Sequence, residues 1–237
     1  MILCVIPARS GSKRVPDKNI RPFANQPLIS YSIAAAFQSG VFDRVVISTD
    51  SEAIAAVARK LGAEVPFLRS PELSDDFTPT APVLLHAIRA VVAEGQVPQY
   101  VCCLYATAPF VRPEDLVLGY ETIRATGASS VFSVTTFAFP IFRALKCTEI
   151  GTLAMLWPEH ELTRSNDLID VYHDAGQFYW VDGLRFLDMP CFYTLDARPV
   201  VLPRVRVQDI DTLEDWEMAE NMFRAHTCVR DGEPDKS

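Results

Sequence analysis

Residues 2–19 read ILCVIPARSGSKRVPDKN, an apolar run followed directly by a basic loop. Ile2–Ile6 is too short for a helix and ends at Pro7, so it predicts a buried strand. Four cations and one acid follow between Arg9 and Lys18, a local excess of three positive charges. Ligands of open α/β sheets bind beyond the carboxyl ends of the strands. We therefore expect this loop to lie at a binding edge.

The composition of the loop favours an anionic ligand. Ser10, Gly11 and Ser12 are small, so backbone N–H groups can approach an anion closely. Arginine forks and lysine point charges can neutralise several phosphate oxygens together, which predicts a triphosphate. A single glycine disfavours the dinucleotide-binding and Walker-type motifs. The plain alternative is a solvated basic loop, which its position after a strand and its small residues argue against.

The first 135 residues alternate short apolar runs with helical patterns. The predicted strands are Ile2–Ile6, Arg44–Ser48, Glu64–Leu68, Tyr100–Tyr105 and Ser130–Thr135. The predicted helices are Pro27–Gln38, Glu52–Leu61, Thr80–Ala93 and Pro113–Ala125. This alternation indicates an α/β fold, doubly wound, with a mostly parallel sheet and helices on both faces.

Residues 136–206 break the alternation and are rich in aromatic side chains. We expect an inserted, antiparallel arm that covers the site or meets a second subunit, with core packing as the alternative. Its strand signals are Phe178–Val181 and Val200–Leu202. A last helix is predicted at about Leu213–Ala225, and residues 226–237 are expected to form a disordered tail. Residues 1–225 thus form a single domain.

Composition limits the classes of function. The chain has 237 residues, with 22 basic and 30 acidic side chains, net charge -8, and 49% hydrophobic residues. These values exclude bulk disorder, and the acidic balance argues against nucleic-acid binding. No apolar run reaches the length of about 18–20 residues that spans a bilayer, so we expect no membrane association. The six cysteines form no CxxC pair, and the start of the chain lacks a secretory signal, so a cytoplasmic protein with reduced thiols is expected.

Two carboxylates lie just before the last predicted helix. In an extended segment residues i and i+2 share a face, so Asp209 and Asp211 converge. They repel one another and favour a counter-cation, for which Mg²⁺ is suited. The alternative is that Asp211 or Thr212 caps the helix while Asp209 is solvated. Together with a triphosphate loop, the metal interpretation is the better one.

Several segments resemble one known family. They are IPARSGSKRVPDKN, VVISTD, EVPFLRSPELSDD, YATAPF, FSVTTFAFPIFRALK, TRSNDL, YHDAGQFYW and QDIDTLEDW. They resemble the CMP-sialic acid synthetase family, the cytidylyltransferases that activate nonulosonic acids, and the likeness extends to about residue 224. YATAPF and YHDAGQFYW look most like the branch that acts on pseudaminic acid.

The resemblance implies a Rossmann-like nucleotidyltransferase and a reaction. CTP and a nine-carbon α-keto sugar acid would give the CMP-sugar and pyrophosphate, with Mg²⁺ as cofactor. It also implies a homodimer in which the inserted arm contributes to the neighbouring active site. Sialic, legionaminic or Kdo cytidylyltransferases are alternatives within this chemistry. A non-catalytic nucleotide-binding module is the alternative of a different class.

The resemblance also assigns residues to the nucleotide. The expected nucleotide-binding set is Ala8, Arg9, Ser10, Gly11, Lys13, Lys18, Asn19, Arg69, Thr80 and Tyr105. Arg9, Lys18, Asp209 and Asp211 are the expected catalytic residues, with Asp209 and Asp211 as metal ligands. Tyr105 departs from the family, because sialic acid enzymes often carry a glutamine at this place.

The sugar is expected to lie against the arm. Its carboxylate needs a cation, for which Arg143 and Arg164 are candidates, although either could form an ordinary surface salt bridge. His173, Asp174, Gln177 and Tyr179 alternate polar and aromatic groups, which suits a pocket for a sugar with acetamido groups. His173 could act as a general base, although a lone histidine is more often structural. The aromatic content favours a deoxygenated sugar such as pseudaminic acid.

Overall fold

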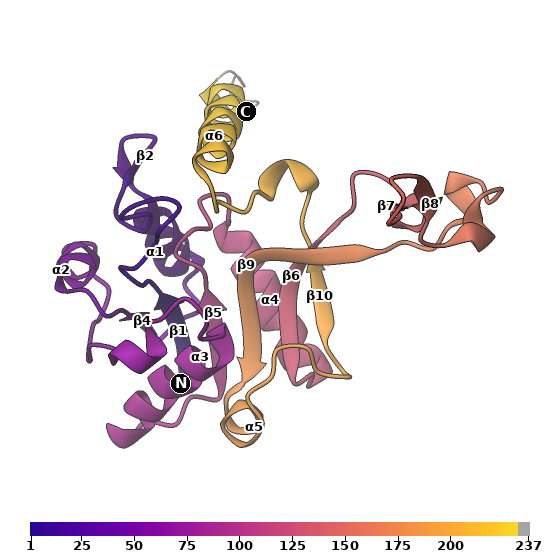
Figure 1. Cartoon of the computed structure of the whole chain (residues 1–237). Helices are drawn as coiled ribbons and strands as arrows, with labels where there is room; N and C mark the ends of the chain where they lie inside the picture. Colours follow the sequence, from indigo (N-terminus) through magenta and orange to yellow (C-terminus); the bar gives the residue numbers. More distant parts are fainter. Residues whose placement is uncertain (232–237) are drawn as a thin grey trace, which may run out of the picture.

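A six-stranded sheet forms the centre of the protein in the computed structural model, which describes residues 1–231 (Figure 1). The strand order is β10-β6-β9-β5-β1-β4. The strands are β1 (Ile2–Pro7), β4 (Arg44–Ser48), β5 (Tyr100–Leu104), β6 (Ser130–Thr136), β9 (Tyr172–Asp182) and β10 (Arg198–Val201). β1 is parallel to β4 and β5, and β10 is parallel to β6. Only β9 runs against its neighbours, β5 and β6, so the sheet is mostly parallel, as expected.

Helices cover both faces of the sheet, which confirms the doubly wound α/β class. One face packs against α1 (Leu28–Ser39), α2 (Glu52–Lys60) and α4 (Pro113–Thr126). The other face packs against α3 (Thr80–Ala93) and α5 (Gly183–Asp188). The neighbouring residues Cys102 and Cys103 belong to the two different cores, because successive side chains of a strand point to opposite faces.

The C-terminal helix α6 (Leu213–Asp231) stands at one end of the molecule beside a small hairpin (Figure 1). The hairpin consists of β2 (Pro22–Phe23) and β3 (Gln26–Pro27). Phe23 and Trp216 meet edge to face at 5.5 Å between ring centroids, and Ile210 is fully buried in the same cluster. The helix continues beyond the expected end at about Ala225 as far as Asp231. The rest of the expected tail, residues 232–237, lies outside the described residues.

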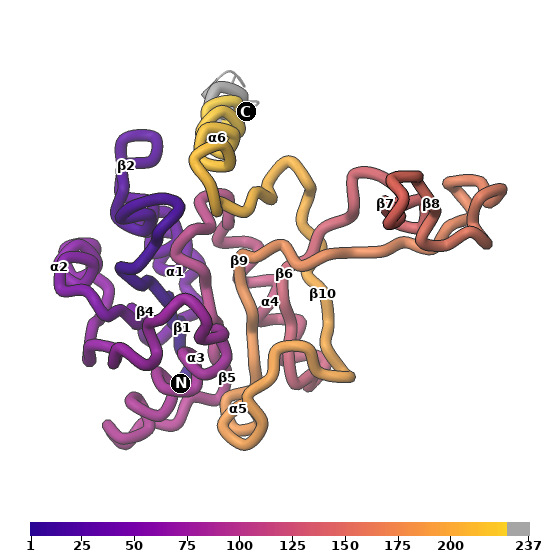
Figure 2. Tube along the Cα trace, in the orientation of Figure 1, coloured from indigo at the N-terminus to yellow at the C-terminus, as the bar shows by residue number. Residues whose placement is uncertain are grey.

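The inserted segment is shorter than the sequence indicates. Figure 2 shows an arm, residues 137–171, that leaves the body at the end of β6 and returns as β9. It carries β7 (Leu145–Cys147) and β8 (Leu153–Met155). Residues 172–206, also expected in the insertion, supply two strands of the central sheet. Phe178 and Trp180 are fully buried there, so core packing is the correct interpretation for them.

One expected strand is not formed. Residues 64–68 make only two isolated parallel bridges, Val46 with Glu64 and Thr49 with Leu68. Pro66 lies between them and has no N–H group to donate to the sheet, which prevents a continuous ladder. The segment follows β4 as an irregular edge and leads to the loop that begins at Arg69.

The remaining elements are short. In the described part of the chain, five 3-10 helices lie at Pro71–Leu73, Ile141–Arg143, Pro158–His160, Ser165–Asp167 and Arg204–Arg206. Within residues 1–231, none of the helices combines the length and the apolar character needed to span a bilayer.

Candidate active site

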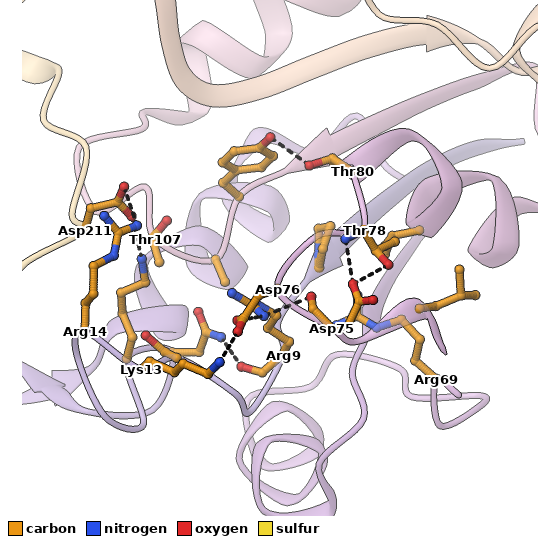
Figure 3. A pocket seen from close by; sticks show the side chains of 18 residues that line it. Arg9, Lys13, Arg14, Arg69, Asp75, Asp76, Thr78, Thr80, Thr107 and Asp211 are labelled. Carbon is orange, nitrogen blue, oxygen red and sulfur yellow. Dashed lines mark hydrogen bonds and ion pairs between the residues drawn. The ribbon is translucent and has the colours of Figure 1, made fainter. Parts of the chain in front are cut away.

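A cavity of about 500 Å³ opens at the carboxyl ends of β1 and β5 (Figure 3). Pro7 ends β1 and lines the cavity, and residues 105–107, which follow β5, line it too. The basic loop after β1, the loop after Arg69 and the first turn of α3 complete the wall. The basic loop therefore lies at the edge of the sheet where its position after a buried strand predicted it.

Five cations and three aspartates line this cavity. They are Arg9, Lys13, Arg14, Lys18 and Arg69, together with Asp75, Asp76 and Asp211. Asp76 forms ion pairs with Arg9 (Nη1–Oδ1 2.6 Å) and Lys13 (Nζ–Oδ2 2.5 Å). The hydrogen bonds from Lys13 and Arg9 lower the pKa of Asp76. Arg9 also donates to the backbone oxygen of Asp75 at 2.9 Å.

The shape of the basic loop is held by groups behind it. Asn19 is buried and donates through Nδ2 to the backbone oxygen of Arg9 at 2.8 Å. Ser10 donates through its backbone N–H and its hydroxyl to Asp50, at 2.9 and 2.6 Å. Burial raises the pKa of Asp50, but these hydrogen bonds outweigh it and lower the pKa overall. Asp50 follows β4 and is a site residue that the sequence did not indicate.

Arg69 lies at the base of the cavity and is 6% exposed. Its Nε donates to the Ser74 hydroxyl at 3.1 Å. Burial lowers the pKa of Arg69, the charge of Asp50 opposes this, and the charge of Arg9 adds to it. No carboxylate among the described residues forms an ion pair with Arg69, and a desolvated guanidinium in this state favours an anionic ligand.

The N-terminal loop and the C-terminal aspartates meet at Asp211. Its carboxylate lies 3.4 Å from Nζ of Lys18 and 2.8 Å from Nη2 of Arg14. Lys18 also donates to the backbone oxygen of Ile210 at 2.5 Å. Residues 192 positions apart in the chain thus form one site. The fully buried Ile210 fixes the segment that carries the pair.

The capping alternative for Asp211 is resolved by its neighbours. The Thr212 hydroxyl accepts a hydrogen bond from the backbone N–H of Asp215 at 3.2 Å. The Asp215 carboxylate in turn accepts one from the backbone N–H of Thr212 at 2.8 Å. This reciprocal pair satisfies the start of α6. Thr212 therefore caps the helix, and the Asp211 carboxylate is left to line the cavity.

The aspartate pair fits a hard divalent cation. Burial and the charge of Asp211 raise the pKa of Asp209, whereas Lys18 lowers it. The two negative charges therefore repel one another, and no ion pair involves Asp209 within residues 1–231. Magnesium is typically held by one or two carboxylates, with water and substrate phosphate as further ligands. No group of three or more His, Cys, Asp or Glu side chains gathers as a metal site in the described part of the chain.

A chain of hydroxyl groups extends from the cavity to the root of the arm. Tyr105 and Thr80 share a hydrogen bond of 3.0 Å at the cavity wall. Burial raises the pKa of Tyr105 to about 12, so its phenol is neutral at pH 7. The ring of Tyr179 lies 5.4 Å from that of Tyr105. Tyr179 and Tyr193 both donate to Oδ2 of Asp174 at 2.6 Å, and Tyr193 is a member of this cluster that the sequence did not single out.

A bulge in β9 positions this cluster. Phe132 pairs with Tyr179 and Val134 with Asp174, so Ser133 alone faces residues 175–178. The Ser133 hydroxyl accepts hydrogen bonds from the backbone N–H groups of residues 177 and 178, at 3.3 and 3.2 Å. Gly176 adopts a φ of +61° in the bulge, a left-handed conformation that favours glycine.

The other expected sugar residues lie apart from the cavity of their own chain. Arg143 donates to the backbone oxygen of Thr163 and Arg164 pairs with Asp167, both within the arm. His173 is exposed, with its ring against Phe137. Gln177 is buried and donates to the backbone oxygen of Arg206 at 2.6 Å, so it supports the segment that leads to the aspartates.

These features define a class of protein. A doubly wound domain with a basic cavity at the carboxyl edge of its sheet, which also includes Asp211, is typical of a nucleotide-binding α/β domain. The family model described as Cytidylyltransferase matches residues 3–185. The chain belongs to this cytidylyltransferase family, and it is a nucleotidyltransferase by that membership.

Individual relatives cover almost the whole chain. Pseudaminic acid cytidylyltransferase of Campylobacter jejuni serotype O:2 is 42% identical over 94% of this chain and 97% of its own length. CMP-N,N'-diacetyllegionaminic acid synthase of Legionella pneumophila is 34% identical over 94% of this chain and 96% of its own. The solved structure of CMP:2-keto-3-deoxy-manno-octonic acid synthetase complexed with CTP superposes with a TM-score of 0.66 at 14% identity. It covers 95% of this chain and 99% of its own, and it shows the shared fold.

Proposed function

We propose that this protein transfers CMP from CTP to pseudaminic acid, releasing pyrophosphate. The observation that carries the proposal is the junction of the basic loop with Asp211 in one cavity of about 500 Å³. That cavity offers phosphate-binding cations beside carboxylates of the kind that hold magnesium. The 42% identity to a pseudaminic acid cytidylyltransferase supports the choice of base and sugar.

The proposed step is an in-line attack by the anomeric hydroxyl oxygen of the sugar on the α-phosphorus, with loss of the hydroxyl proton to solvent. The bond from that phosphorus to the bridging oxygen breaks, and pyrophosphate leaves with the electron pair. Such transfer depends on positioning and charge stabilisation more than on covalent help from the protein. In the proposal, Arg9 and Lys18 stabilise the charge that develops on the leaving group. Asn19 keeps Arg9 in place through its backbone oxygen.

Asp209 and Asp211 are the residues that would hold Mg²⁺ in this proposal. The cation would supply polarisation of the α-phosphate and neutralisation of its charge. Arg14 lies against Asp211 and orients its carboxylate from the other side. The buried ion pair between Arg206 and Asp115 supports the same segment from behind, with Nη2 and Oδ1 3.0 Å apart.

The sugar is proposed to lie against Tyr105 and the Asp174 cluster. Tyr105 takes the place where sialic acid enzymes often carry glutamine, and its neutral phenol can donate or accept a hydrogen bond. The rings of Tyr105 and Tyr179 provide apolar faces for acetamido methyl groups. The resemblance to a legionaminic acid enzyme at 34% identity makes that sugar the second candidate.

We further propose a cytoplasmic homodimer in which the arm reaches the site of a second copy. The arm exposes Phe139, Ile150 and Leu162 at 82%, 86% and 92%, an apolar surface typical of an interface. It also carries Arg143 and Arg164, the candidates for the sugar carboxylate. Five cysteines, Cys4, Cys102, Cys103, Cys147 and Cys191, are free thiols, which supports a reducing compartment.

A pyrophosphate-release screen tests the proposed function. Four nucleoside triphosphates are combined with pseudaminic, legionaminic and sialic acids and Kdo, in the presence of Mg²⁺. We expect turnover with CTP and pseudaminic acid, and a product with the mass of the CMP-sugar. Binding of CTP without turnover on any sugar would instead identify a nucleotide-binding module.

A further inference from the structure

A carboxylate of the protein occupies the phosphate-binding face of the basic loop. Asp76 lies between Arg9 and Lys13, at 2.6 and 2.5 Å from their nitrogen atoms (Figure 3). Asp211 pairs in the same way with Arg14 and Lys18. Each of the four cations of the loop thus faces an aspartate. The two carboxylates offset half of the positive charge of these four cations before a ligand arrives.

The two aspartates differ in their surroundings. Asp211 lies beside Asp209, where a cation can hold both carboxylates. The side chain of Asp76 has only Arg9 and Lys13 as hydrogen-bonding or ion-pair partners within residues 1–231. A ligand that takes over these two cations therefore has to displace Asp76.

The loop that carries Asp76 is shaped by other residues. The Asp75 carboxylate accepts the N–H groups of Phe77 and Thr78, at 3.0 and 2.6 Å, and thereby forms the turn. The Thr78 hydroxyl also donates to the backbone oxygen of Glu72 at 3.0 Å. Asp76 takes no part in these bonds, so its charge can be removed without removing a bond of the turn.

We propose that Asp76 is a built-in competitor for phosphate, which sets how tightly the site holds a polyphosphate. Its ion pairs are exposed, with the Lys13 side chain 81% accessible, and exposed pairs are weak. A triphosphate brings several charges to the same cations and displaces the single carboxylate. A small anion with one phosphate gains too little binding free energy to displace the Asp76 carboxylate. Asp76 thereby favours polyphosphate ligands over the abundant simple anions.

This inference goes beyond the proposed function but rests on its claim that the cavity binds a nucleoside triphosphate. The test separates the two. Inorganic tripolyphosphate probes the phosphate face alone, and cytidine probes the nucleoside alone. Tripolyphosphate, cytidine and CTP are each titrated into the protein in a separate calorimetric experiment. The ionic strength is fixed, and EDTA is present so that metal binding does not contribute.

Asp76→Asn removes the competitor and is expected to tighten the binding of tripolyphosphate and CTP by about three- to tenfold. Its affinity for cytidine is expected to equal that of the wild type. Asp76→Glu restores the carboxylate and is expected to return the affinity for tripolyphosphate towards the wild-type value. Thermal unfolding of each variant confirms that the fold is retained.

Glu72→Gln is the matched control. Glu72 lies on the same loop and is exposed, and it forms no ion pair with Arg9 or Lys13. The same gain in affinity in Glu72→Gln would show a general charge effect and overturn the proposal. Equal or weaker tripolyphosphate binding by Asp76→Asn would overturn it too, because Asp76 would then be organising the cations. A wild-type protein that binds tripolyphosphate but not CTP would contradict the proposed function. The affinities of the variants for tripolyphosphate could still be compared with that of the wild type, so the role of Asp76 would still be tested.

Discussion

Asp211 is the residue at which the two ends of the chain meet in the site. Arg14 and Lys18 hold its carboxylate, while the cap of α6 is made by Thr212 and Asp215. The Asp211 side chain is therefore not needed to cap α6. Its position among cations is the basis for the proposal that Asp211 helps to hold a metal–nucleotide complex.

Asp211→Asn is expected to lower the rate of pyrophosphate release by about 10²–10³-fold. The amide keeps the shape of the side chain but loses the charge that a magnesium ion requires. The rate is measured with saturating CTP and sugar over a range of Mg²⁺ concentrations. Glu214→Gln, an exposed neighbour in the first turn of α6, serves as the control and should react like the wild type. Wild-type turnover in Asp211→Asn would overturn the metal assignment.

Part of the site could be predicted from single residues. The run from Arg9 to Lys18 and the aspartate pair have compositions that suggest their chemistry. The structure brings the loop and Asp211 to one cavity, whereas Asp209 does not line it. Asp50 and Asp76 could not be assigned, because nothing local ties them to the loop after β1. Asp76 is 67 residues from Arg9, and only the course of the loop after Arg69 brings the two together.

At the scale of elements, α4 and β9 approach unusually closely at Gly119. A Cβ atom there would lie 2.5 Å from Cδ1 of Trp180, closer than packing allows. Trp180 is fully buried and stacks on Phe42 with ring centroids 5.1 Å apart, so the indole cannot move aside freely. The absence of a side chain at residue 119 sets the distance between this helix and the sheet.

Gly119→Ala is expected to lower the free energy of unfolding by about 1–3 kcal/mol, because overpacking forces the indole or the helix to shift. Denaturant titration monitored by tryptophan fluorescence measures the change. Glu121→Ala on the exposed face of the same helix should stay within about 0.5 kcal/mol of the wild type. A stability equal to that of the wild type in Gly119→Ala would show that the contact relaxes at no cost.

The start of β6 is fastened to the loop before β10 by Asp196. Hydrogen bonds from Thr194 and Ser129 lower the pKa of Asp196 from 3.8 to about 2. A carboxyl whose pKa is lower in the folded state adds stability when ionised in both states. This contribution is complete above about pH 4 and is lost as the pH falls toward about 2.

Asp196→Asn is therefore expected to be less stable than the wild type at pH 7, with the difference narrowing as the pH falls below about 4. Urea titrations at a series of pH values measure it. Asp188→Asn, an exposed carboxylate of α5 without a hydrogen bond or ion pair among the described residues, should show no such trend. A difference for Asp196→Asn that is constant with pH would exclude a role for its charge.

The elements themselves were predictable where local signals agree. Arg44–Ser48 and Thr80–Ala93 have the expected bounds, because apolar period and flanking residues point to the same ends. The expected strand at 64–68 was wrong because Pro66 interrupts its hydrogen bonding. The apolar run Phe178–Val181 predicted a strand but not its partners. Pairing with β5 and β6 depends on the path of a 35-residue arm (137–171) that carries no signal for it.

For the whole molecule, the arm is the feature that a single chain does not explain. It extends away from the sheet (Figure 1), and its apolar side chains Phe139, Ile150 and Leu162 are exposed to solvent. A second copy that covers these side chains would bury apolar surface and bring the arm arginines near another cavity. The homodimer proposed above accounts for both features.

Leu162→Asp is expected to shift the protein from dimer to monomer, because it places a charge in the proposed apolar contact. Sedimentation velocity measures the state, and pyrophosphate release should fall along with the dimer. Leu195→Asp is the matched control, since Leu195 is a fully exposed leucine of the body and not of the arm. A wild type that sediments as a monomer would contradict the proposal.

The place of β9 in the sheet has a consequence for biosynthesis. β9 alone joins the parallel group β4-β1-β5 to the parallel pair β6-β10, although it is made after most of them. While the ribosome is still translating the arm, β5 has an unpaired edge and β6 has no neighbour on either side. Such edges attract other chains. A nascent polypeptide that stalls before residue 172 would therefore leave these edges open to other chains, whereas pairing of the eleven residues of β9 covers an edge of both β5 and β6.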